Sequence, residues 1–289
     1  MKYIFFGTPE FAATILQKLI EVGMPPAALV CNPDRPQGRK KVITPPPVKG
    51  VILKSGANID ILQPEILDNV FLDKLKSYEA DFYVVAAYSK ILKSELIDIP
   101  PKGVIGVHPS LLPRLRGASP IQSAILGGSE TTGVTLFLID EKVDHGPIIG
   151  SAVYIMDRPH NYTELLDILA SLAGTLLVKT LPAFDKGGIK PEIQNEEEVT
   201  FTKKFTTQDG EVAIGDLKRA LDGSNPELAN LINRKIKALN PEPGVYAIIG
   251  SKRTKLLNSA MDKTRLVLKD IQFEGKKPMP FSQYQQPLS

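Results

Sequence analysis

Tyr3-Ile4-Phe5-Phe6-Gly7-Thr8-Pro9-Glu10, close to the start of the chain, indicates the kind of sheet that this protein builds. The four apolar residues in a row predict a buried strand, and Gly7 suits a tight turn. Thr8 is expected at the helix N-cap and Pro9 at the first helical position, where its missing N–H costs no hydrogen bond. Apolar residues at helical spacing then follow from Ile15 to Ile20. A strand, a turn and a helix in this order predict an open α/β domain.

The same alternation continues along the first two thirds of the chain. Apolar runs at residues 27–30, 82–86 and 104–107 lie between helical stretches, which is typical of a parallel sheet with crossover helices. Two further strand candidates, residues 135–139 and 148–156, are able to extend that sheet. A long apolar helix is expected over residues 162–181.

A polar segment separates this part from a smaller C-terminal part. Residues 191–210 show little apolar periodicity and are interpreted as a linker. Beyond it, two helices are expected at 214–221 and 226–239, and three short strands at 245–249, 255–258 and 265–268. Turn residues between the strands favour a small β-barrel. We therefore predict two domains, residues 1–190 and 211–289, which agrees with a length of 289 residues.

Composition limits the class of protein. The single cysteine, Cys31, excludes an internal disulfide, and three histidines show no zinc-ligand spacing. Neither a signal-like leader nor an uninterrupted apolar run long enough for a membrane span is visible, so a soluble cytoplasmic protein is expected.

Charge is unevenly distributed along the chain. The net formal charge is −3 over residues 1–200 and +6 over residues 201–289. A basic C-terminal part is typical of a module that binds a polyanion, since Lys and Arg contacts to phosphates dominate nucleic-acid affinity. Ordinary surface lysine explains the same count, so charge alone leaves both interpretations open.

Two loops contain residues that can carry chemistry. His108 ends the predicted strand 104–107, and a proline-rich loop from 108 to 117 follows it. Asp144 lies in a polar loop over 140–147, between two strand candidates. An imidazole oriented by a carboxylate can polarise a carbonyl, stabilise an oxyanion or move a proton, which acyl transfer to an amine requires. A structural histidine and a polar β-turn are the alternatives for the two loops taken singly.

These loops resemble a known family. His108-Pro-Ser-Leu-Leu-Pro113, followed by Gly117 and by Asp144 in a later turn, is similar to the signature of enzymes that use 10-formyltetrahydrofolate. Among these enzymes, the sequence is most similar to the methionyl-tRNA formyltransferases. The similarity is seen at the opening Phe6-Gly-Thr-Pro-Glu-Phe-Ala12 and at other motifs along nearly the whole chain. These further motifs are residues 32–41, 46–49, 202–204, 240–244 and 274–279.

The resemblance implies a Rossmann-like catalytic domain with a mostly parallel sheet and a C-terminal barrel similar to an OB-fold. It also implies formyl transfer from the folate co-substrate to methionyl initiator tRNA, as a monomer and without a metal. Ten residues are implied to bind the folate: Ser110, Leu111, Leu112, Pro113, Lys90, Ile91, Leu92, Ile139, Asp140 and Val143. Core packing is the alternative role for the leucines.

Basic residues are expected to contact the tRNA. Those in the loop 34–41 lie among Pro and Gly, where no hydrophobic face can bury them, and exposed Arg and Lys suit phosphates and base edges. Others follow in the C-terminal part. The full set is Arg35, Arg39, Lys40, Lys41, Lys203, Lys204, Arg234, Lys235, Lys237, Lys252, Arg253 and Lys255.

Gly106 departs from the family pattern, which has Asn two residues before the histidine to help fix the formyl oxygen. Glycine has no donor in its side chain, although a water is able to take the place of the missing carboxamide. Because Gly106 stands at the position of the family Asn, it is counted with His108 and Asp144 in the expected catalytic set.

Two alternative functions stay open. One is a formyltransferase for a small amine, namely an amino sugar nucleotide or glycinamide ribonucleotide, and the other is a tRNA-binding relative with weak or no activity.

Overall fold

The structure is a computed structural model that describes residues 1–38 and 40–284. Its contacts separate two compact units, which are described in turn. Unit 1 comprises residues 1–117, 131–155 and 166–201, and unit 2 comprises residues 118–130, 156–165 and 202–289. The sequence suggested residues 118–130 and 156–165 as parts of the first domain. Most of their contacts are instead with the C-terminal part of the chain, so they belong to unit 2. Residues 191–201, which the sequence suggested as linker, belong to unit 1.

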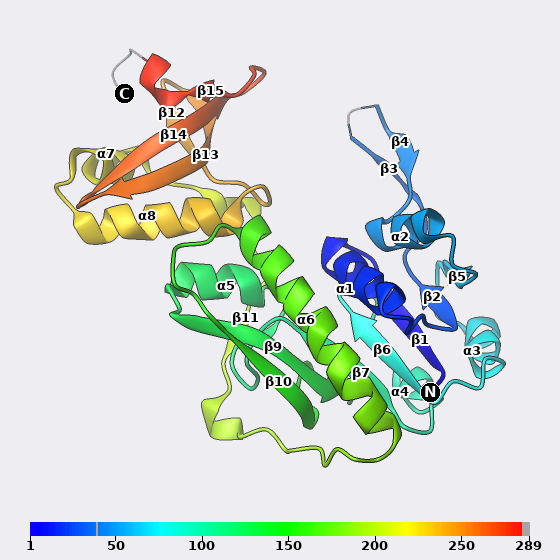
Figure 1. Cartoon of the computed structure of the whole chain (residues 1–289). Coiled ribbons are helices and arrows are strands. Elements are labelled where there is room, and N and C mark those ends of the chain that lie inside the picture. The colour runs from blue at the N-terminus through cyan, green and yellow to red at the C-terminus, as the bar shows by residue number, and fades with distance from the viewer. Residues whose placement is uncertain (39, 285–289) are drawn as a thin grey trace. The chain divides into compact units, whose positions relative to one another are not determined.

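Unit 1 is built on a seven-stranded sheet in the order β10-β9-β7-β6-β1-β2-β5 (Figure 1). β1, β2, β5, β6 and β7 are parallel, whereas β9 and β10 are antiparallel to their neighbours. The strands are β1 (Tyr3–Gly7), β2 (Ala28–Val30), β5 (Asp60–Leu62), β6 (Phe82–Ala86), β7 (Val104–His108), β9 (Thr131–Leu138) and β10 (Ile148–Ile155). The prediction of a mostly parallel α/β sheet is confirmed.

Helices cover both faces of this sheet, which explains its unbroken apolar strands. On one face, Ile4 and Phe6 of β1 pack with Leu75 and Leu96 in a buried cluster. On the other face, Tyr3 stacks on the ring of Phe82. The helices of this unit are α1 (Glu10–Glu21), α2 (Pro47–Ser55), α3 (Asn69–Lys76), α4 (Ser94–Ile97) and most of α6 (Tyr162–Asp185).

α6 is long and apolar enough to cross a membrane by length and composition alone. Leu169, Ala173 and Leu177 of this helix are fully buried in the protein. Phe184 near its end meets Phe82 of β6 edge-on, with ring centroids 5.8 Å apart. These contacts are those of a helix that packs on a sheet.

The first helix begins one residue later than the sequence suggested. Pro9 is the N-cap of α1, and no side chain caps the helix. The hydroxyl of Thr8 accepts a hydrogen bond from the backbone N–H of Asn32 at 3.3 Å. Thr8 therefore joins the first two strands at their C-terminal ends, a long-range contact that helix-capping rules do not consider.

A small hairpin and a short strand pair complete unit 1. β3 (Arg35–Gln37) and β4 (Val42–Thr44) pair antiparallel, away from the main sheet (Figure 1). β8 (Arg116–Gly117) pairs with β11 (Phe201–Thr202), which begins at the last residue of this unit and is preceded by the 3-10 turn Glu196–Glu198.

Unit 2 contains an antiparallel sheet in the order β12-β13-β14-β15. Its strands are β12 (Tyr246–Ile249), β13 (Lys252–Asp262), β14 (Arg265–Phe273) and β15 (Met279–Pro280). Its helices are α5 (Pro120–Gly127), α7 (Ile214–Asp222) and α8 (Pro226–Leu239), with 3-10 turns at Thr207–Gly210 and Phe281–Gln283. Buried Asn233 of α8 accepts a hydrogen bond from the Ser259 hydroxyl of β13 at 2.9 Å. The strands that the sequence predicted at 245–249, 255–258 and 265–268 are thus present as β12, β13 and β14 of this antiparallel sheet.

Candidate active site

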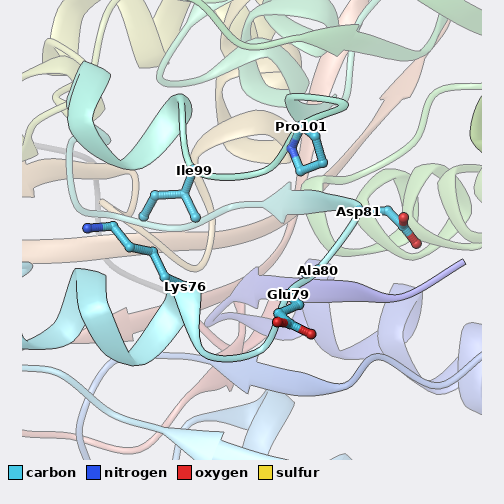
Figure 2. Close-up of a pocket in the computed structure, with 6 residues that line it drawn as sticks. All are labelled: Lys76, Glu79, Ala80, Asp81, Ile99 and Pro101. Atoms are coloured by element: carbon cyan, nitrogen blue, oxygen red, sulfur yellow. The ribbon is translucent and has the colours of Figure 1, made fainter.

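A pocket of about 380 Å³ lies where β6 and β7 begin (Figure 2). Asp81 in its lining accepts a hydrogen bond from the backbone of Lys2 and lies near the Lys102 ammonium, so its charge is compensated. Open α/β sheets bind their ligands at the carboxyl ends of the strands, which is the opposite edge. This pocket is therefore not our candidate site.

His108, at the end of β7, is a buried side chain with an acceptor at each ring nitrogen. Nε2 lies 2.9 Å from the carbonyl oxygen of Leu115, and Nδ1 lies 3.5 Å from Oδ2 of Asp144. The imidazole is only 6% exposed. An N–H on Nε2 faces the Leu115 carbonyl in this arrangement, and it can donate instead to a carbonyl oxygen that displaces Leu115.

Asp144 approaches His108 from a loop that starts elsewhere on the sheet. Because β9 is antiparallel to β7, its last residue, Leu138, pairs with Ile105 near the start of β7. The loop after β9 therefore leaves the sheet near the start of β7, whereas the loop after His108 leaves it at the end of β7. The loop after β9 folds back, and the Asp144 carboxylate accepts a hydrogen bond from the backbone N–H of Gly117 at 2.8 Å. The predicted pair of imidazole and carboxylate is thus formed by loop geometry.

The backbone at Asp144 is in the left-handed region, with φ of +48°. A residue other than glycine adopts this conformation at a cost, and it persists only where neighbouring groups hold it. Asp144 is therefore held in an unfavourable conformation at the point where it faces His108.

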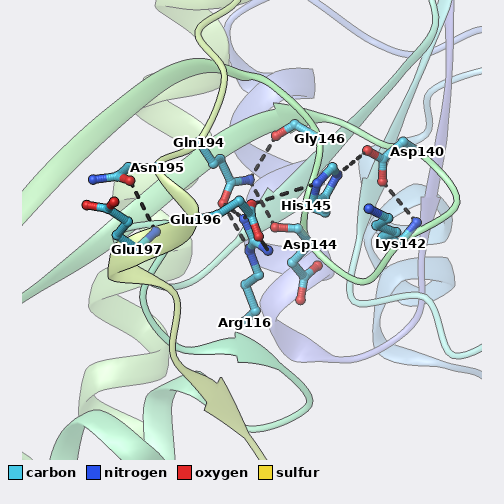
Figure 3. A network of polar contacts seen from close by, with 10 residues as sticks. All are labelled: Arg116, Asp140, Lys142, Asp144, His145, Gly146, Gln194, Asn195, Glu196 and Glu197. Atoms are coloured by element: carbon cyan, nitrogen blue, oxygen red, sulfur yellow. Dashed lines mark hydrogen bonds and ion pairs between the residues drawn. The ribbon is translucent and has the colours of Figure 1, made fainter.

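A polar network lies around this loop (Figure 3). The Arg116 side chain, 3% exposed, bonds to Glu196 at 2.7 Å and to the amide oxygen of Gln194. His145 lies 2.6 Å from Asp140 through Nδ1 and 3.7 Å from Glu196 through Nε2. The Arg116 guanidinium holds the pKa of Glu196 below its usual range. The network joins the loop after His108, the loop of Asp144 and the segment before β11.

Gly106 lies beneath an aromatic ring. It pairs with Phe137 across β7 and β9, and a Cβ at position 106 would lie 2.5 Å from Cε1 and 2.6 Å from Cζ of that ring. Phe137 is 3% exposed. An aromatic ring laid over a cross-strand glycine fills the space that the missing side chain leaves. The ring thus occupies the space next to Gly106 that a Cβ would take.

The predicted folate residues fall into two groups. Ser110 and Leu112 are buried, and the Ser110 hydroxyl donates to the Arg114 carbonyl at 2.6 Å, so these residues shape the loop itself. Ile91 and Val143 are large apolar side chains that are 87% and 64% exposed. The remaining residues of the set have varied surroundings. Leu92 and Ile139 pack against one buried cluster, and Leu111 and Pro113 are half-buried. Lys90 donates hydrogen bonds to the backbone carbonyls of Pro64 and Glu65. Asp140 pairs with His145.

Three predicted tRNA residues of unit 1, Arg35, Lys40 and Lys41, belong to the β3–β4 hairpin. Lys40 and Lys41 are exposed, and Arg35 forms an ion pair with Glu65. Arg39 lies outside the described residues. The hairpin base is held by Lys49 of α2, whose ammonium lies 2.9 Å from Asp34.

The predicted tRNA residues of unit 2 have different surroundings. Most of them are exposed, namely Lys203, Lys204, Arg234, Lys252, Arg253 and Lys255. Lys235 donates to the Glu211 carbonyl, and burial lowers its pKa. The Arg253 guanidinium lies 3.7 Å from the Tyr246 ring centroid. Lys237 and Lys255 line a pocket of about 510 Å³ together with three asparagine side chains.

Sequence reasoning missed Arg116, His145, Gln194 and Glu196. Arg116 lies near the end of the histidine loop and His145 follows Asp144, so their positions offered a weak signal. Gln194 and Glu196 lie in a polar segment without periodicity and offered none. Within the described residues, no group of three or more His, Cys, Asp or Glu side chains is arranged to hold a metal ion.

Comparison with known proteins shows which family this sequence resembles. The family model described as formyl transferase matches residues 1–181. Methionyl-tRNA formyltransferase of Chloroflexus aurantiacus is 36% identical over 262 residues, which cover 90% of this chain and 80% of the relative.

Solved structures share the fold. HypX from Aquifex aeolicus in complex with tetrahydrofolic acid has a TM-score of 0.68 at 14% identity, over 98% of this chain and 46% of that one. Methionyl-tRNA formyltransferase from Clostridium thermocellum has a TM-score of 0.61 at 17% identity, over 94% of this chain and 98% of that one. The family match over most of unit 1 and the identity along nearly the whole sequence lead to one conclusion: the chain belongs to the formyl transferase family.

Proposed function

We propose that this protein transfers a formyl group from 10-formyltetrahydrofolate to the α-amine of methionyl initiator tRNA, in the cytoplasm and as a monomer. The observation that carries the proposal is the approach of His108 Nδ1 to Asp144 at 3.5 Å in a member of the formyl transferase family. The similarity to a methionyl-tRNA formyltransferase along nearly the whole chain supports the tRNA substrate. In this proposal residues 1–190 carry the transfer, and residues 211–289, joined by 191–210, bind tRNA.

The reaction forms a bond between the amine nitrogen and the formyl carbon and breaks the bond from that carbon to N10 of the folate. The amine loses a proton, and N10 gains one. Negative charge grows on the formyl oxygen during the attack, and a positioned N–H donor there lowers the barrier. His108 supplies this donor by exchanging the Leu115 carbonyl for the formyl oxygen, and Asp144 orients the imidazole.

The residues present fit a folate. A pterin has flat apolar faces and a polar edge, and sites for such groups combine apolar walls with a few backbone or side-chain donors and acceptors. Ile91 and Val143 remain exposed although both are large and apolar. Leu92 and Ile139 pack against the same cluster, which brings the segment 90–92 near the start of the loop 139–143. We assign the apolar walls to Ile91 and Val143 and the polar edge to the backbone of residues 139–143.

The basic residues fit the second substrate. Exposed Lys40 and Lys41 on the β3–β4 hairpin would contact phosphates near the end that receives the formyl group. Lys237 and Lys255 in the pocket of unit 2 would hold the tRNA body. Affinity that depends on such contacts falls steeply with salt because bound counterions are released.

The test is formylation of methionyl initiator tRNA with 10-formyltetrahydrofolate under single-turnover conditions. We expect transfer with the initiator tRNA, and transfer that is lost when the methionyl amine is blocked. Glycinamide ribonucleotide and an amino sugar nucleotide serve as alternative acceptors. Transfer only to one of these small amines would contradict the tRNA substrate.

A second candidate, a tRNA-binding relative with slow or no transfer, is favoured by the Phe137 ring over Gly106, since this ring offers no hydrogen bond to a formyl oxygen. A gel-shift with initiator and elongator tRNAs separates this candidate from the first. Tight binding of tRNA together with no transfer would favour the second candidate.

A further inference from the structure

Gln194 uses both ends of its side-chain amide. Its Oε1 accepts from Nε of Arg116 at 3.1 Å and from an Nη of the same residue at 2.8 Å. Its Nε2 donates to the carbonyls of Asp144 at 3.0 Å and of Gly146 at 2.8 Å. Because a guanidinium only donates and a carbonyl only accepts, the orientation of this amide is determined by its partners. The side chain is 5% exposed, so water does not compete freely for these bonds.

These bonds join three segments that are far apart in the sequence (Figure 3). Arg116 is the next residue after Leu115, whose carbonyl oxygen lies 2.9 Å from His108 Nε2. The backbone N–H of Arg116 donates to the carbonyl of Thr200 at 2.9 Å, and the N–H of Leu115 donates to the Thr200 hydroxyl at 2.8 Å. The segment from Gln194 to Thr200 therefore holds the loop of His108 from one side and the loop of Asp144 from the other.

The backbone at Asp144 requires such support. Its φ of +48° is unfavourable for a residue other than glycine, and the two carbonyls that Gln194 binds belong to this residue and to Gly146. The same conformation directs the carboxylate to the N–H of Gly117 and toward His108. Loss of the amide donors would leave this loop free to relax toward a more favourable conformation.

We propose that Gln194 is a positioning residue, which holds the backbone of residues 144–146 so that the Asp144 carboxylate faces His108. Gln194 touches neither substrate and acts through Asp144. The role in turnover rests on the proposed function, whereas the role in holding the loop does not.

Two substitutions separate this role from a purely structural one. Gln194→Glu keeps an acceptor for the buried Arg116 and loses both amide donors. Gln194→Met has a similar length and loses the acceptor as well. Gln17→Met on α1 is the matched control, because Gln17 bonds only to Glu21 on the exposed surface among the contacts described.

The expected result is a fall in kcat of at least about tenfold in Gln194→Glu, since a small displacement of a catalytic group is enough for such a loss. The KM values for folate and tRNA should stay within about threefold of the wild type, since neither substrate contacts the amide. Gln17→Met should match the wild type. A folded Gln194→Glu protein with wild-type kcat, or one whose loss is confined to KM, would overturn the proposal. Gln194→Met should lose at least as much activity, and if it does not fold, Gln194→Glu alone decides.

Hydrogen exchange provides a readout that does not depend on activity. In Gln194→Glu, peptides that cover residues 140–147 should exchange faster while those of β1 and β6 keep their protection. Unchanged exchange over 140–147 would overturn the proposal. A wild-type protein that transfers no formyl group would refute the proposed function, and the exchange result would still decide the role of Gln194.

Discussion

Gly106→Asn places a side chain where the Phe137 ring now lies. The new Cβ would be 2.5 Å and 2.6 Å from two ring carbons and 3.1 Å from Cγ1 of Ile139, so the ring has to move. Phe137 is 3% exposed and cannot turn outward freely. Overpacking of this kind costs about 1–3 kcal/mol of stability. We therefore expect Gly106→Asn alone to be less stable than the wild type and to gain little activity.

The double variant Gly106→Asn/Phe137→Leu removes the obstruction. An asparagine beside His108 adds a second donor for the formyl oxygen, and losing one such donor typically costs about 10²–10³ in kcat. Partial restoration predicts a gain of at least about tenfold in kcat, or about 1.4 kcal/mol of transition-state stabilisation. Binding of tRNA should change little, since the new donor acts mainly in the transition state. The two substitutions should also show a favourable coupling in stability, because they share one contact.

The assay is single-turnover formyl transfer at saturating folate, combined with urea unfolding of all four proteins: wild type, each single variant and the double variant. Phe137→Leu alone is the control, and it should be slightly less stable and no more active than the wild type. Two outcomes would refute the reasoning. One is a Gly106→Asn protein as stable as the wild type, and the other is a double variant that transfers no faster, which would show that another group already supplies the donor.

Three further predictions follow from the site and the hairpin. His108→Ala and Asp144→Ala should each lower kcat by about two orders of magnitude, as loss of a positioned acid–base or oxyanion group commonly does; near-wild-type turnover of either folded variant removes that residue from the mechanism. Lys40→Ala/Lys41→Ala should raise KM for tRNA and flatten the salt dependence of tRNA binding while folate binding stays unchanged, and an unaltered kcat/KM would make the hairpin a solvated surface. Asp34→Asn should destabilise the protein at pH 7, since a hydrogen bond from a lysine keeps the pKa of this carboxyl below its ordinary 3.8. That contribution is present above pH 3.8 and is lost as pH falls through the lowered pKa. The unfolding midpoints of variant and wild type should therefore approach one another as the pH is lowered below 3.8, and a difference that stays constant over that range would contradict the prediction.

Much of the fold was predictable because its signals are local. The buried run Tyr3–Gly7, its glycine turn and the helical repeat after it need only neighbouring residues to be interpreted. The same holds for the helix Pro226–Leu239, which begins at an Asn cap followed by proline. The helix-capping role that local rules predict for Thr8 was wrong, because its hydroxyl accepts a hydrogen bond from the backbone N–H of Asn32, just after another strand.

The site was predictable only in part. His108 and Asp144 were predicted as site residues because each lies in a recognisable loop, and the structure places them 3.5 Å apart. The route by which they meet was not predictable, since it depends on the antiparallel direction of β9. The Phe137 ring over Gly106 depends on the same register, because cross-strand neighbours are set by pairing and not by sequence distance.

By itself, then, the sequence determined several of the strands and helices, the uneven charge and the two loops that carry the candidate chemistry, because each is specified by residues close together in the chain. Only the tertiary structure decided which partners those residues meet. Gln194 shows the difference: a lone glutamine in a polar segment has no pattern, and its importance arises from one guanidinium and two carbonyls that folding brings within hydrogen-bond distance. Hydrogen bonds of this kind depend on atoms placed to within a few tenths of an ångström, and such placement is a property of the packed chain.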